Sequence, residues 1–527
     1  MKNLFLLSPA RYGMVIATAG VLGLRAEDWP RWGGNDPGRN MYSSAHGLPD
    51  IVDAGKAQSD RAPIDPRTAK NVKWVAELGS QSYGNVVVSG GKVFIGTNNE
   101  HPRDPQHQGD RSILLCLDEK TGRFLWQLVI PKLASGKVND WENLGLLSSP
   151  CVEGNRVYVV SSRCEVLCLD TEGLANGNDG PFLDEAQYVA GPGKPKAAIG
   201  PKDADIIWRY DMMDELGVFP HNASNCSILV VGDLLYVCTS NGQDWTHVNV
   251  PSPNAPSLIA LNKKTGALLG EDEAHIGTRL FHGQWCSPSA GQVGDRWLIF
   301  FGGGDGVCYA FDALPAKERD ESYLKRVWWF DCNPPDRKTK NGKSIRYPDA
   351  EGPSEINATP VFWKNRVYVA VGQDPEHGEG VGMLTCMDAT QTGDITQTGK
   401  IWSYDKINRS LSTVSITPDG LLFVNDFSGY TYCFDAESGK LYWTFDHKAH
   451  VWGSTLVADG KVYTGDEDGN LVILAASKEK KVLCTADLGA PVYSTPVVAN
   501  GVLYVASNRQ LYAFSDETKK GAAAVTP

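Results

Sequence analysis

The stretch LLCLDEKTGRFLWQL, residues 114–128, decides the fold because it recurs along the chain. Its central part, CLDEKTGRFLW (116–126), aligns without a gap with CFDAESGKLYW (433–443), and ALNKKTGALLG (260–270) is a third copy. Looser copies begin near residues 168, 310, 386 and 513, and three of them reach their aromatic residue later, at Trp208, Trp328 and Trp402. Such self-similarity indicates a fold assembled from one repeated structural unit.

A two-strand pattern precedes each copy. In SSPCVEGNRVYVVSS (148–162) and STPVVANGVLYVASN (494–508), alternating apolar residues flank a short turn with Gly or Asn, which is typical of a β-hairpin. Hairpin and motif together make four strands, A to D, and eight strand-A starts can be counted, near residues 85, 149, 225, 287, 358, 413, 454 and 494. This spacing predicts an all-β, eight-bladed β-propeller over residues 71–515. Seven blades would result if the degenerate unit near residues 473–483 were not a full blade.

The last unit ends at its third strand, at residues 512–515, and lacks a fourth strand with a Trp. The segment NVKWVAEL (71–78), just before the first unit, can supply both through Trp74. We therefore predict that this N-terminal strand completes the last blade and closes the ring.

The polar and reactive residues of the opening stretch all have structural roles in such a fold. Asp118 can accept N–H hydrogen bonds from the turn, and Gly122 supplies the positive φ that a short turn needs. Trp126 lies on the outer strand, where it can cover the neighbouring blade. Cys116 occupies a slot that other copies fill with Cys168, Cys386, Cys433, Ala260, Ala310 and Ala513. It is therefore expected to be a small buried residue and not a redox thiol.

Few of the 12 cysteines are expected to form bridges. Equivalent positions on different blades lie too far apart. Cys226 and Cys238 flank one hairpin, but with Gly232-Asp233 as its turn their side chains point to opposite faces. Pairs stay open among the other six, which are Cys151, Cys164, Cys286, Cys308, Cys332 and Cys484.

The order small residue, any residue, Asp, then Thr/Ser-Gly and Trp resembles the tryptophan-docking motif of the pyrroloquinoline quinone (PQQ) repeat family. That family includes the eight-bladed quinoprotein alcohol dehydrogenases and the BamB-like propellers of outer-membrane assembly. The resemblance covers about residues 71–515 and implies the propeller fold. The quinoprotein branch further implies PQQ and Ca²⁺, a Trp floor under the quinone, and Glu, Asn and Asp around the cation.

The sequence departs from both branches in one respect each. It has no two adjacent cysteines for the vicinal disulfide that the quinoprotein branch implies. Its first 26 residues contain no Cys for the lipid anchor that the assembly branch implies. A haem-attachment C-x-x-C-H is also absent, so any electrons would leave to a separate acceptor.

Residues 1–26 are predicted to be a secretory signal peptide. Lys2 and Arg11 flank an apolar run from Met14 to Leu24, and Ala26 is a small residue at a plausible cleavage point. The run is shorter than the ~20 residues of a membrane span, and no later run approaches that length. We therefore expect a periplasmic or secreted protein without a membrane span, with an N-terminal extension over 27–70 and a C-terminal tail over 516–527. The formal net charge of −12 argues against nucleic acid as a partner.

The loops predict one functional face. In a propeller the D–A and B–C connections share a face, and here the B–C connections at 98–111, 240–256 and 372–382 are long, whereas the A–B turns are tight. Nine of the ten His residues fall on this face. Since His is a natural metal ligand and proton carrier near neutral pH, the clustering indicates a site. The alternative, that loops are simply polar, predicts His on both faces.

Residues of the D–A connections are the candidates for ligand binding: Trp141, Glu142, Asn143, His221, Asn225, His282, Trp285, Asn357, His450 and Trp452. The Trp side chains can stack on a planar ligand. Glu142 and Asn225 are candidate metal ligands because carboxylate and amide oxygens suit a hard cation such as Ca²⁺. No catalytic residue can be assigned.

Two functions fit these observations. The preferred one is a scaffold that binds a small molecule, glycan or protein at the His/Trp-rich mouth, and the lack of adjacent cysteines and of a clear acid–base pair favours it. The alternative is a PQQ- and Ca²⁺-dependent dehydrogenase, which the fold and the Trp, Glu and Asn residues of the mouth favour. Under the first hypothesis no cofactor is required.

Overall fold

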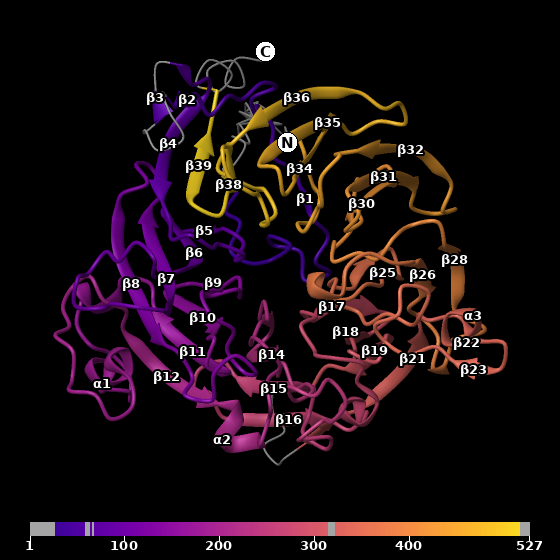
Figure 1. Cartoon of the computed structure of the whole chain (residues 1–527), viewed down its shortest axis with the longest axis horizontal. Helices are drawn as coiled ribbons and strands as arrows, with labels where there is room; N and C mark the ends of the chain where they lie inside the picture. The colour runs from indigo at the N-terminus through magenta and orange to yellow at the C-terminus, as the bar shows by residue number, and fades with distance from the viewer. Residues whose placement is uncertain (1–26, 58–63, 66–67, 315–321, 517–527) are drawn as a thin grey trace, which may run out of the picture.

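The repeated motif forms the outer half of a blade, and eight such blades stand in a ring around a central axis (Figure 1). This computed structural model describes residues 27–57, 64–65, 68–314 and 322–516. The predicted signal peptide and residues 517–527 of the predicted tail lie outside the described residues. The predicted all-β, eight-bladed propeller is confirmed.

The first four blades each take four consecutive antiparallel strands, apart from one inserted strand in blade four. Blade one is β5 to β8 (Val87–Ser89, Lys92–Asn98, Arg111–Asp118, Phe124–Pro131). Blade two is β9 to β12 (Cys151–Glu153, Arg156–Val160, Glu165–Asp170, Ile206–Asp211). Blade three is β13 to β16 (Leu229–Val231, Leu234–Cys238, Leu258–Asn262, Leu268–Asp272). Blade four is β17, β18, β19 and β21 (Ser289–Val293, Arg296–Gly302, Val307–Asp312, Arg326–Asp331).

The other four blades complete the ring. Blade five is β24, β25, β26 and β28 (Val361–Trp363, Arg366–Ala370, Leu384–Asp388, Lys400–Tyr404). Blade six is β29 to β32 (Ser415–Ile416, Leu421–Asn425, Tyr430–Asp435, Leu441–Asp446). Blade seven is β33 to β36 (Leu456–Ala458, Lys461–Gly465, Asn470–Ala475, Val482–Asp487). Blade eight is β37 to β39 (Val497–Ala499, Val502–Ala506, Gln510–Phe514) with β4 (Val72–Glu77).

Short elements decorate this ring. Three two- or three-residue strands extend blades in parallel: β1 (Tyr42–Ser43) on blade seven, β20 (Ser322–Leu324) on blade three and β27 (Gly393–Asp394) on blade four. Two small hairpins are β2–β3 (Lys56–Ala57, Ile64–Asp65) and β22–β23 (Thr339–Lys340, Lys343–Ser344). The helices of the described chain are all short: α1 (Glu185–Ala190), α2 (Met212–Leu216), α3 (Pro335–Lys338), η2 (Gly173–Ala175), η3 (Ile276–Arg279) and η4 (Pro375–His377). None of them is long and apolar enough to be a candidate membrane span.

One register position explains the repeated motif. The small residue of the third strand faces the Trp of the fourth strand, as in Cys116 opposite Trp126, and a β-bulge follows at once. Blade seven reverses the sizes, with Ile473 opposite Cys484, and keeps the bulge. The degenerate unit is therefore a full blade, and the seven-bladed alternative is wrong.

The ring closes as predicted. β4 pairs with β39 and places Trp74 opposite Ala513, the same register as in the other blades. Figure 1 shows the N-terminal β4 beside the C-terminal β39. The N-terminal strand and the last repeat therefore share one sheet.

The motif residues have the packing roles expected of them. The Asp118 carboxylate accepts hydrogen bonds from the N–H (2.9 Å) and hydroxyl (2.6 Å) of Thr121, and these bonds, the hydroxyl first, lower the Asp118 pKa. Gly122 has φ +69°. Trp126 donates its indole N–H to the Thr171 carbonyl of the next blade, at 2.9 Å. The opening motif therefore joins neighbouring blades.

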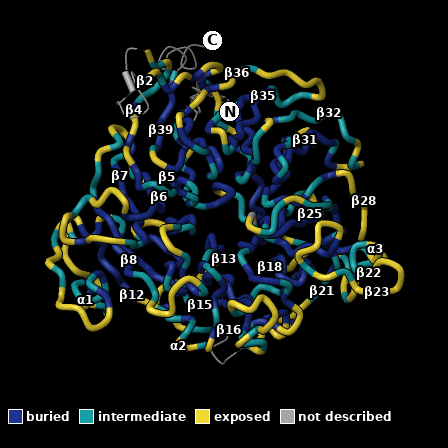
Figure 2. Tube along the Cα trace, in the orientation of Figure 1, coloured by how far each residue is buried: buried dark blue, intermediate teal, exposed yellow. Residues whose placement is uncertain are grey.

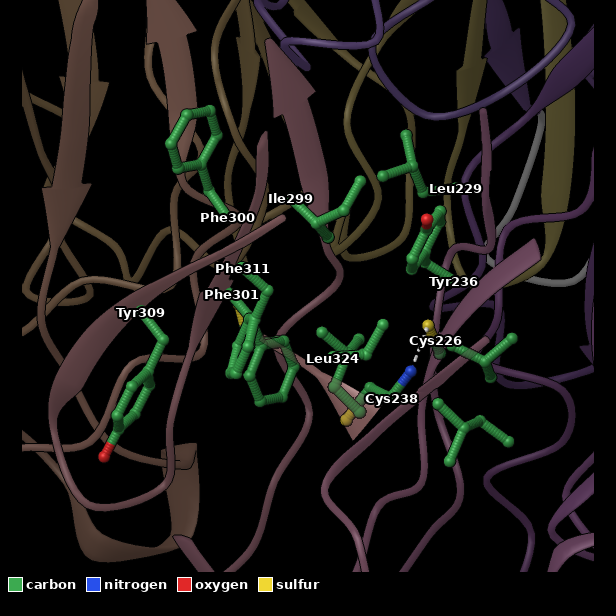
Figure 3. Close-up of a cluster of buried hydrophobic side chains, with 14 of the residues drawn as sticks. Cys226, Leu229, Tyr236, Cys238, Ile299, Phe300, Phe301, Tyr309, Phe311 and Leu324 are labelled. Atoms are coloured by element: carbon green, nitrogen blue, oxygen red, sulfur yellow. Dashed lines mark hydrogen bonds between the residues drawn. The ribbon is translucent and has the colours of Figure 1, made fainter. Parts of the chain in front are cut away.

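All twelve cysteines fall within the described residues, and each is a free thiol. Cys226 and Cys238 lie among the buried side chains of blades three and four, where the Cys238 backbone N–H donates to the Cys226 sulfur at 3.2 Å (Figure 3). The expectation that these two do not bridge is confirmed, and none of the pairs left open by the sequence forms.

The N-terminal extension docks on the propeller and does not form a domain. Its first part, residues 27–43, which we call the tether, hydrogen-bonds to all eight blades, and Figure 1 shows it in indigo across the middle of the ring. Its partners from blade one to blade eight are Val88, Val152, Ile228, Ala290, Phe362, Ile416, Val457 and Asn500.

Arg39 anchors the tether through buried hydrogen bonds. Its side chain is fully buried and donates to the carbonyls of Trp32, Ser227, Ile228 and Pro288. Figure 2 shows that the inner strands around the tether are buried, whereas the exposed segments lie at the rim. The tether is thus part of the core.

Candidate functional site

A cavity of about 470 Å³ opens where the D–A connections meet. All eight of these connections contribute to its lining, through residues such as Tyr83, Leu147, Asn222, Trp285, Asn357, Leu411, Trp452 and Tyr493. The tether adds Trp32, whose indole N–H donates to the Thr359 hydroxyl at 3.2 Å. The volume lies in the range of small-molecule sites, roughly 300–1,000 Å³.

Aromatic rings form much of the wall. Trp452 and Tyr493 have ring centroids 4.4 Å apart, and Tyr83 stacks on Tyr493 at 5.2 Å. Trp141 and Trp285 also line the cavity, and the Trp285 N–H donates to the Ala223 carbonyl at 3.0 Å. These rings are held by packing and hydrogen bonds, so the flat surfaces exist before any ligand arrives.

Five of the ten predicted residues line this cavity: Trp141, Asn225, Trp285, Asn357 and Trp452. His221 and His282 lie directly behind Trp285, with ring centroids 6.2 and 5.5 Å from it.

The other three predicted residues are not among the described residues that line the cavity. Glu142 is exposed and pairs with Lys137 at 3.4 Å, so the structure does not bring it into the cavity with Asn225 as a cation site. The Asn143 backbone N–H donates to Asp110 at 2.8 Å. His450 lies between Glu467 (2.9 Å) and Glu379 (3.1 Å); burial lowers its pKa, but these hydrogen bonds outweigh burial and raise it.

Four imidazole side chains lie close together beside the cavity. We call them the histidine cluster: His221, His247, His282 and His377. The His221 and His282 ring centroids are 4.2 Å apart, and His377 is 4.6 Å from His282. His247 lies 5.1 Å from His221 and 5.0 Å from His282. His221 and His282 are buried, whereas His247 is exposed.

Asp374 connects the histidine cluster to the cavity. It lines the cavity, and its Oδ2 hydrogen-bonds to Nδ1 of His282 (2.7 Å) and Nδ1 of His377 (2.5 Å). Burial raises the Asp374 pKa, but these two hydrogen bonds outweigh burial and hold the pKa well below its usual value. The carboxylate therefore stays charged and orients both rings.

Burial favours the neutral form of two rings of the cluster, His221 and His247. Desolvation, followed by the nearby His282, lowers the pKa of His221 to about 3. Desolvation also lowers the pKa of His247, with contributions from His282 and His377. At neutral pH these two rings are uncharged and present nitrogen lone pairs.

A second buried acid lies next to Asn357. Glu355 accepts a hydrogen bond from the Asn357 amide at 3.0 Å, and burial, followed by repulsion from Asp374, raises its pKa well above the usual value. Its surroundings therefore favour the uncharged form of this carboxyl.

Sequence reasoning placed His247 and His377 on the correct face but left both, and Asp374, out of the candidate set. These three residues lie in the long B–C connections. The sequence signal that could have found them is that long loops, 240–256 and 372–382, occur in both blade three and blade five. Nothing in the local sequence of Trp32 predicts that it lines the cavity.

Comparison with known proteins agrees with this architecture. The family model described as outer membrane protein assembly factor BamB matches residues 394–480 and 428–522. A 1-butanol dehydrogenase (cytochrome c) of Thauera butanivorans is 31% identical over 96 residues, which span 16% of this chain and 14% of that protein. The matched part is thus a small fraction of the relative.

Two solved structures share the fold. A europium-containing methanol dehydrogenase has a TM-score of 0.55 at 12% identity, covering 93% of this chain and 98% of its own. A quinohemoprotein alcohol dehydrogenase from Pseudomonas putida HK5 has a TM-score of 0.52 at 12% identity, covering 93% of this chain and 80% of its own. The docking motif of its blades and the family-model match within residues 394–522 make this chain similar to the PQQ-repeat β-propellers, and the two solved structures share its fold.

Proposed function

We propose that this chain binds a neutral or cationic small molecule with a flat apolar face, such as a sugar or aromatic ring, in the cavity at the propeller mouth. The observation that carries the proposal is the preformed aromatic wall around a volume of about 470 Å³. Flat rings and sugar faces gain dispersion and desolvation energy on such walls. A protein partner would require a wider surface than this cavity offers.

The charge of the lining favours a ligand without negative charge. Among the described residues that line the cavity there is neither Lys nor Arg, whereas Asp374 and Glu376 both contribute to it. Aromatic faces also attract cations and repel anions. Asn85, Asn225 and Asn357 supply the amide groups that would fix the orientation of a polar ligand.

PQQ, the cofactor that the family implies, does not fit this lining well. PQQ is a polycarboxylate, and the cavity offers it acids in place of basic side chains. Glu142, the carboxylate expected to be a Ca²⁺ ligand, is exposed beside Lys137. We therefore derive no reaction through PQQ, and the dehydrogenase alternative rests on the shared fold alone.

We further propose that the protein acts outside the cytoplasm, in the periplasm or secreted, because its first 26 residues have the composition of a secretory signal. N-terminal sequencing of the protein recovered from periplasm or medium tests this: a start near residue 27 is expected, and an intact Met1 in the cytoplasm would contradict it.

Binding is tested on purified full-length protein by calorimetry and tryptophan fluorescence with neutral sugars, aromatic and quaternary ammonium cations, and PQQ with Ca²⁺. We expect saturable binding of a neutral or cationic compound that weakens at least about tenfold in Trp285→Ala and Trp452→Ala. Trp297→Ala, which removes an exposed Trp on β18, is the matched control and should bind normally. Failure of the whole neutral and cationic panel, or stoichiometric PQQ binding with dye-linked alcohol oxidation, would overturn the proposal.

A further inference from the structure

We propose that His221, His247 and His282 bind a transition-metal ion, zinc or copper, through their ring nitrogens. This site is separate from the calcium ligands suggested by the sequence and does not depend on the proposed ligand cavity. It rests on the geometry of the histidine cluster, on the hydrogen bonds that orient its rings, and on the burial of two of them.

The three rings are already close to a metal-binding arrangement. One ligand nitrogen from each of the three residues can be chosen so that all lie within 4.8 Å of one another. A tetrahedral ion with metal–nitrogen distances of about 2.0–2.1 Å requires nitrogens about 3.4 Å apart. Side-chain rotations that move the ring nitrogens by a few tenths of an ångström to about 1 Å would complete the site.

The hydrogen bonds leave the correct nitrogen of each buried ring available. His221 Nδ1 lies 2.6 Å from the Gln243 carbonyl, which can only accept, so this nitrogen carries the proton. His282 Nδ1 lies 2.7 Å from the Asp374 carboxylate and is fixed in the same way. In the described structure the Nε2 atoms of both rings are buried and have no hydrogen-bond partner.

Two buried ring nitrogens without a hydrogen-bond partner are unfavourable. A metal ion would satisfy both at once. A carbonyl or carboxylate on the far nitrogen of a His ligand is also the usual outer shell of metal-bound imidazole, since it fixes the ring and raises its basicity. Asp374 adds a negative charge that offsets the charge of the ion.

The local sequence allows the three loops that carry these histidines to lie close together. His221 comes from the β12–β13 connection, His247 from the β14–β15 connection and His282 from the β16–β17 connection. Gly242 lies between the connections that carry His221 and His282. A Cβ atom at residue 242 would be 2.6 Å from His221 Cβ and 3.0 Å from the His282 carbonyl oxygen. Only glycine permits this approach.

The donor set selects the metal class. Three imidazole nitrogens suit zinc, copper, iron or nickel, whereas Ca²⁺ and Mg²⁺ prefer oxygen ligands. Three protein ligands leave a fourth position for water or a substrate atom. Because His247 is exposed, the ion can enter from solvent.

The test uses untagged full-length protein, freed of metal with a chelator and then titrated separately with Zn²⁺, Cu²⁺ and Co²⁺. We expect one ion per chain by calorimetry and elemental analysis, and visible absorption of bound Co²⁺ typical of tetrahedral nitrogen coordination. His221→Asn, His247→Asn and His282→Asn should each weaken binding by more than about 100-fold, and Asp374→Asn by about 10- to 100-fold.

His275→Asn is the matched control, because His275 is an exposed His of the same loop face with φ +51°, a conformation that Asn tolerates. It should bind metal normally. The exposed ligand variant His247→Asn keeps the test valid if the buried variants fail to fold. The proposal is overturned if the native protein takes up no stoichiometric metal, or if His247→Asn binds metal as tightly as the native protein. It is also overturned if the histidine cluster binds protons at low pH but no metal ion.

Discussion

The indole of Trp74 lies on Gly122 of the next blade, where a Cβ atom would be 2.6 Å from the ring, and its N–H donates to the Glu119 carbonyl at 2.9 Å. Trp74 belongs to blade eight and Gly122 to blade one, so this contact closes the ring. Trp208 on Gly266 and Trp402 on Gly439 repeat it within the chain. The repeated motif is thus a clasp: in these blades, a turn with glycine receives a Trp from the neighbouring blade.

Trp74→Ala should strongly destabilise the propeller. Trp74 is 8% exposed, and truncating a buried aromatic side chain lowers the free energy of unfolding by about 3–5 kcal/mol. Chemical denaturation followed by circular dichroism measures the loss. Trp297→Ala, at 40% exposure, should change it by less than about 1 kcal/mol. Equal losses in both variants would show that Trp74 is not a closing contact.

Arg39→Met should loosen the tether. Methionine fills similar space, but it leaves the carbonyls of Ser227, Ile228 and Pro288 without their donor inside the core, and each unsatisfied buried group costs about 1–3 kcal/mol. Limited proteolysis should then cleave within residues 27–43 much faster than in the native protein, and N-terminal sequencing identifies the cut. Unchanged protection would mean that the backbone bonds of the tether suffice.

Asp205→Asn should stabilise the protein at neutral pH. Burial, which outweighs the hydrogen bond from the Asp179 N–H, raises the pKa of Asp205 to about 6. Between about pH 4 and 6 the unfolded chain has lost this proton while the folded chain keeps it, so the native protein loses stability as pH rises through that window. Asparagine removes the effect, which solvent screening reduces to roughly 1–2 kcal/mol at pH 7.

Denaturation curves at pH 4 and pH 7 separate this effect from a general one. Native and Asp205→Asn proteins should have similar free energies of unfolding at pH 4 and differ at pH 7. Asp295→Asn, which changes an exposed carboxylate, should differ at neither pH. A pH-independent difference for Asp205→Asn would mean that its ionisation is not the cause.

The fold followed from the sequence because its signal is local and repeated. Cys116 and Ala513 occupy the same register opposite Trp126 and Trp74, and eight samples of one pattern make a single degenerate blade recognisable. The tether was harder to predict. Its bonds to eight separate blades depend on the assembled ring, and DWPRWGGNDPGRN shows no periodicity that encodes them.

The site was only partly predictable for a similar reason. The repeat gives the face on which each loop lies, so Trp285, Trp452 and Asn357 could be placed at the mouth. It does not give the path of a long loop, and the meeting of His247 and His377 with His282 depends on such paths. Glu142 illustrates the opposite error: its neighbour Trp141 lines the cavity while Glu142 itself pairs with Lys137.

The glycine under the clasp provides the last prediction. Gly122 has φ +69° and lies under Trp74, whereas Gly90 has φ +59° and a Cβ atom added there would have no heavy atom within 4 Å. Gly90→Ala should lose about 1 kcal/mol from backbone strain. Gly122→Ala should lose that amount and about 1–3 kcal/mol more, because the added methyl displaces the indole.

A double-mutant cycle isolates the contribution of the indole. In a Trp74→Ala background the added methyl has no ring to displace, so Gly122→Ala should then cost no more than Gly90→Ala, in denaturation measured on the same proteins. If Gly122→Ala costs the same with and without Trp74, the glycine is required only for its backbone conformation, and the clasp is held by the indole hydrogen bond to Glu119.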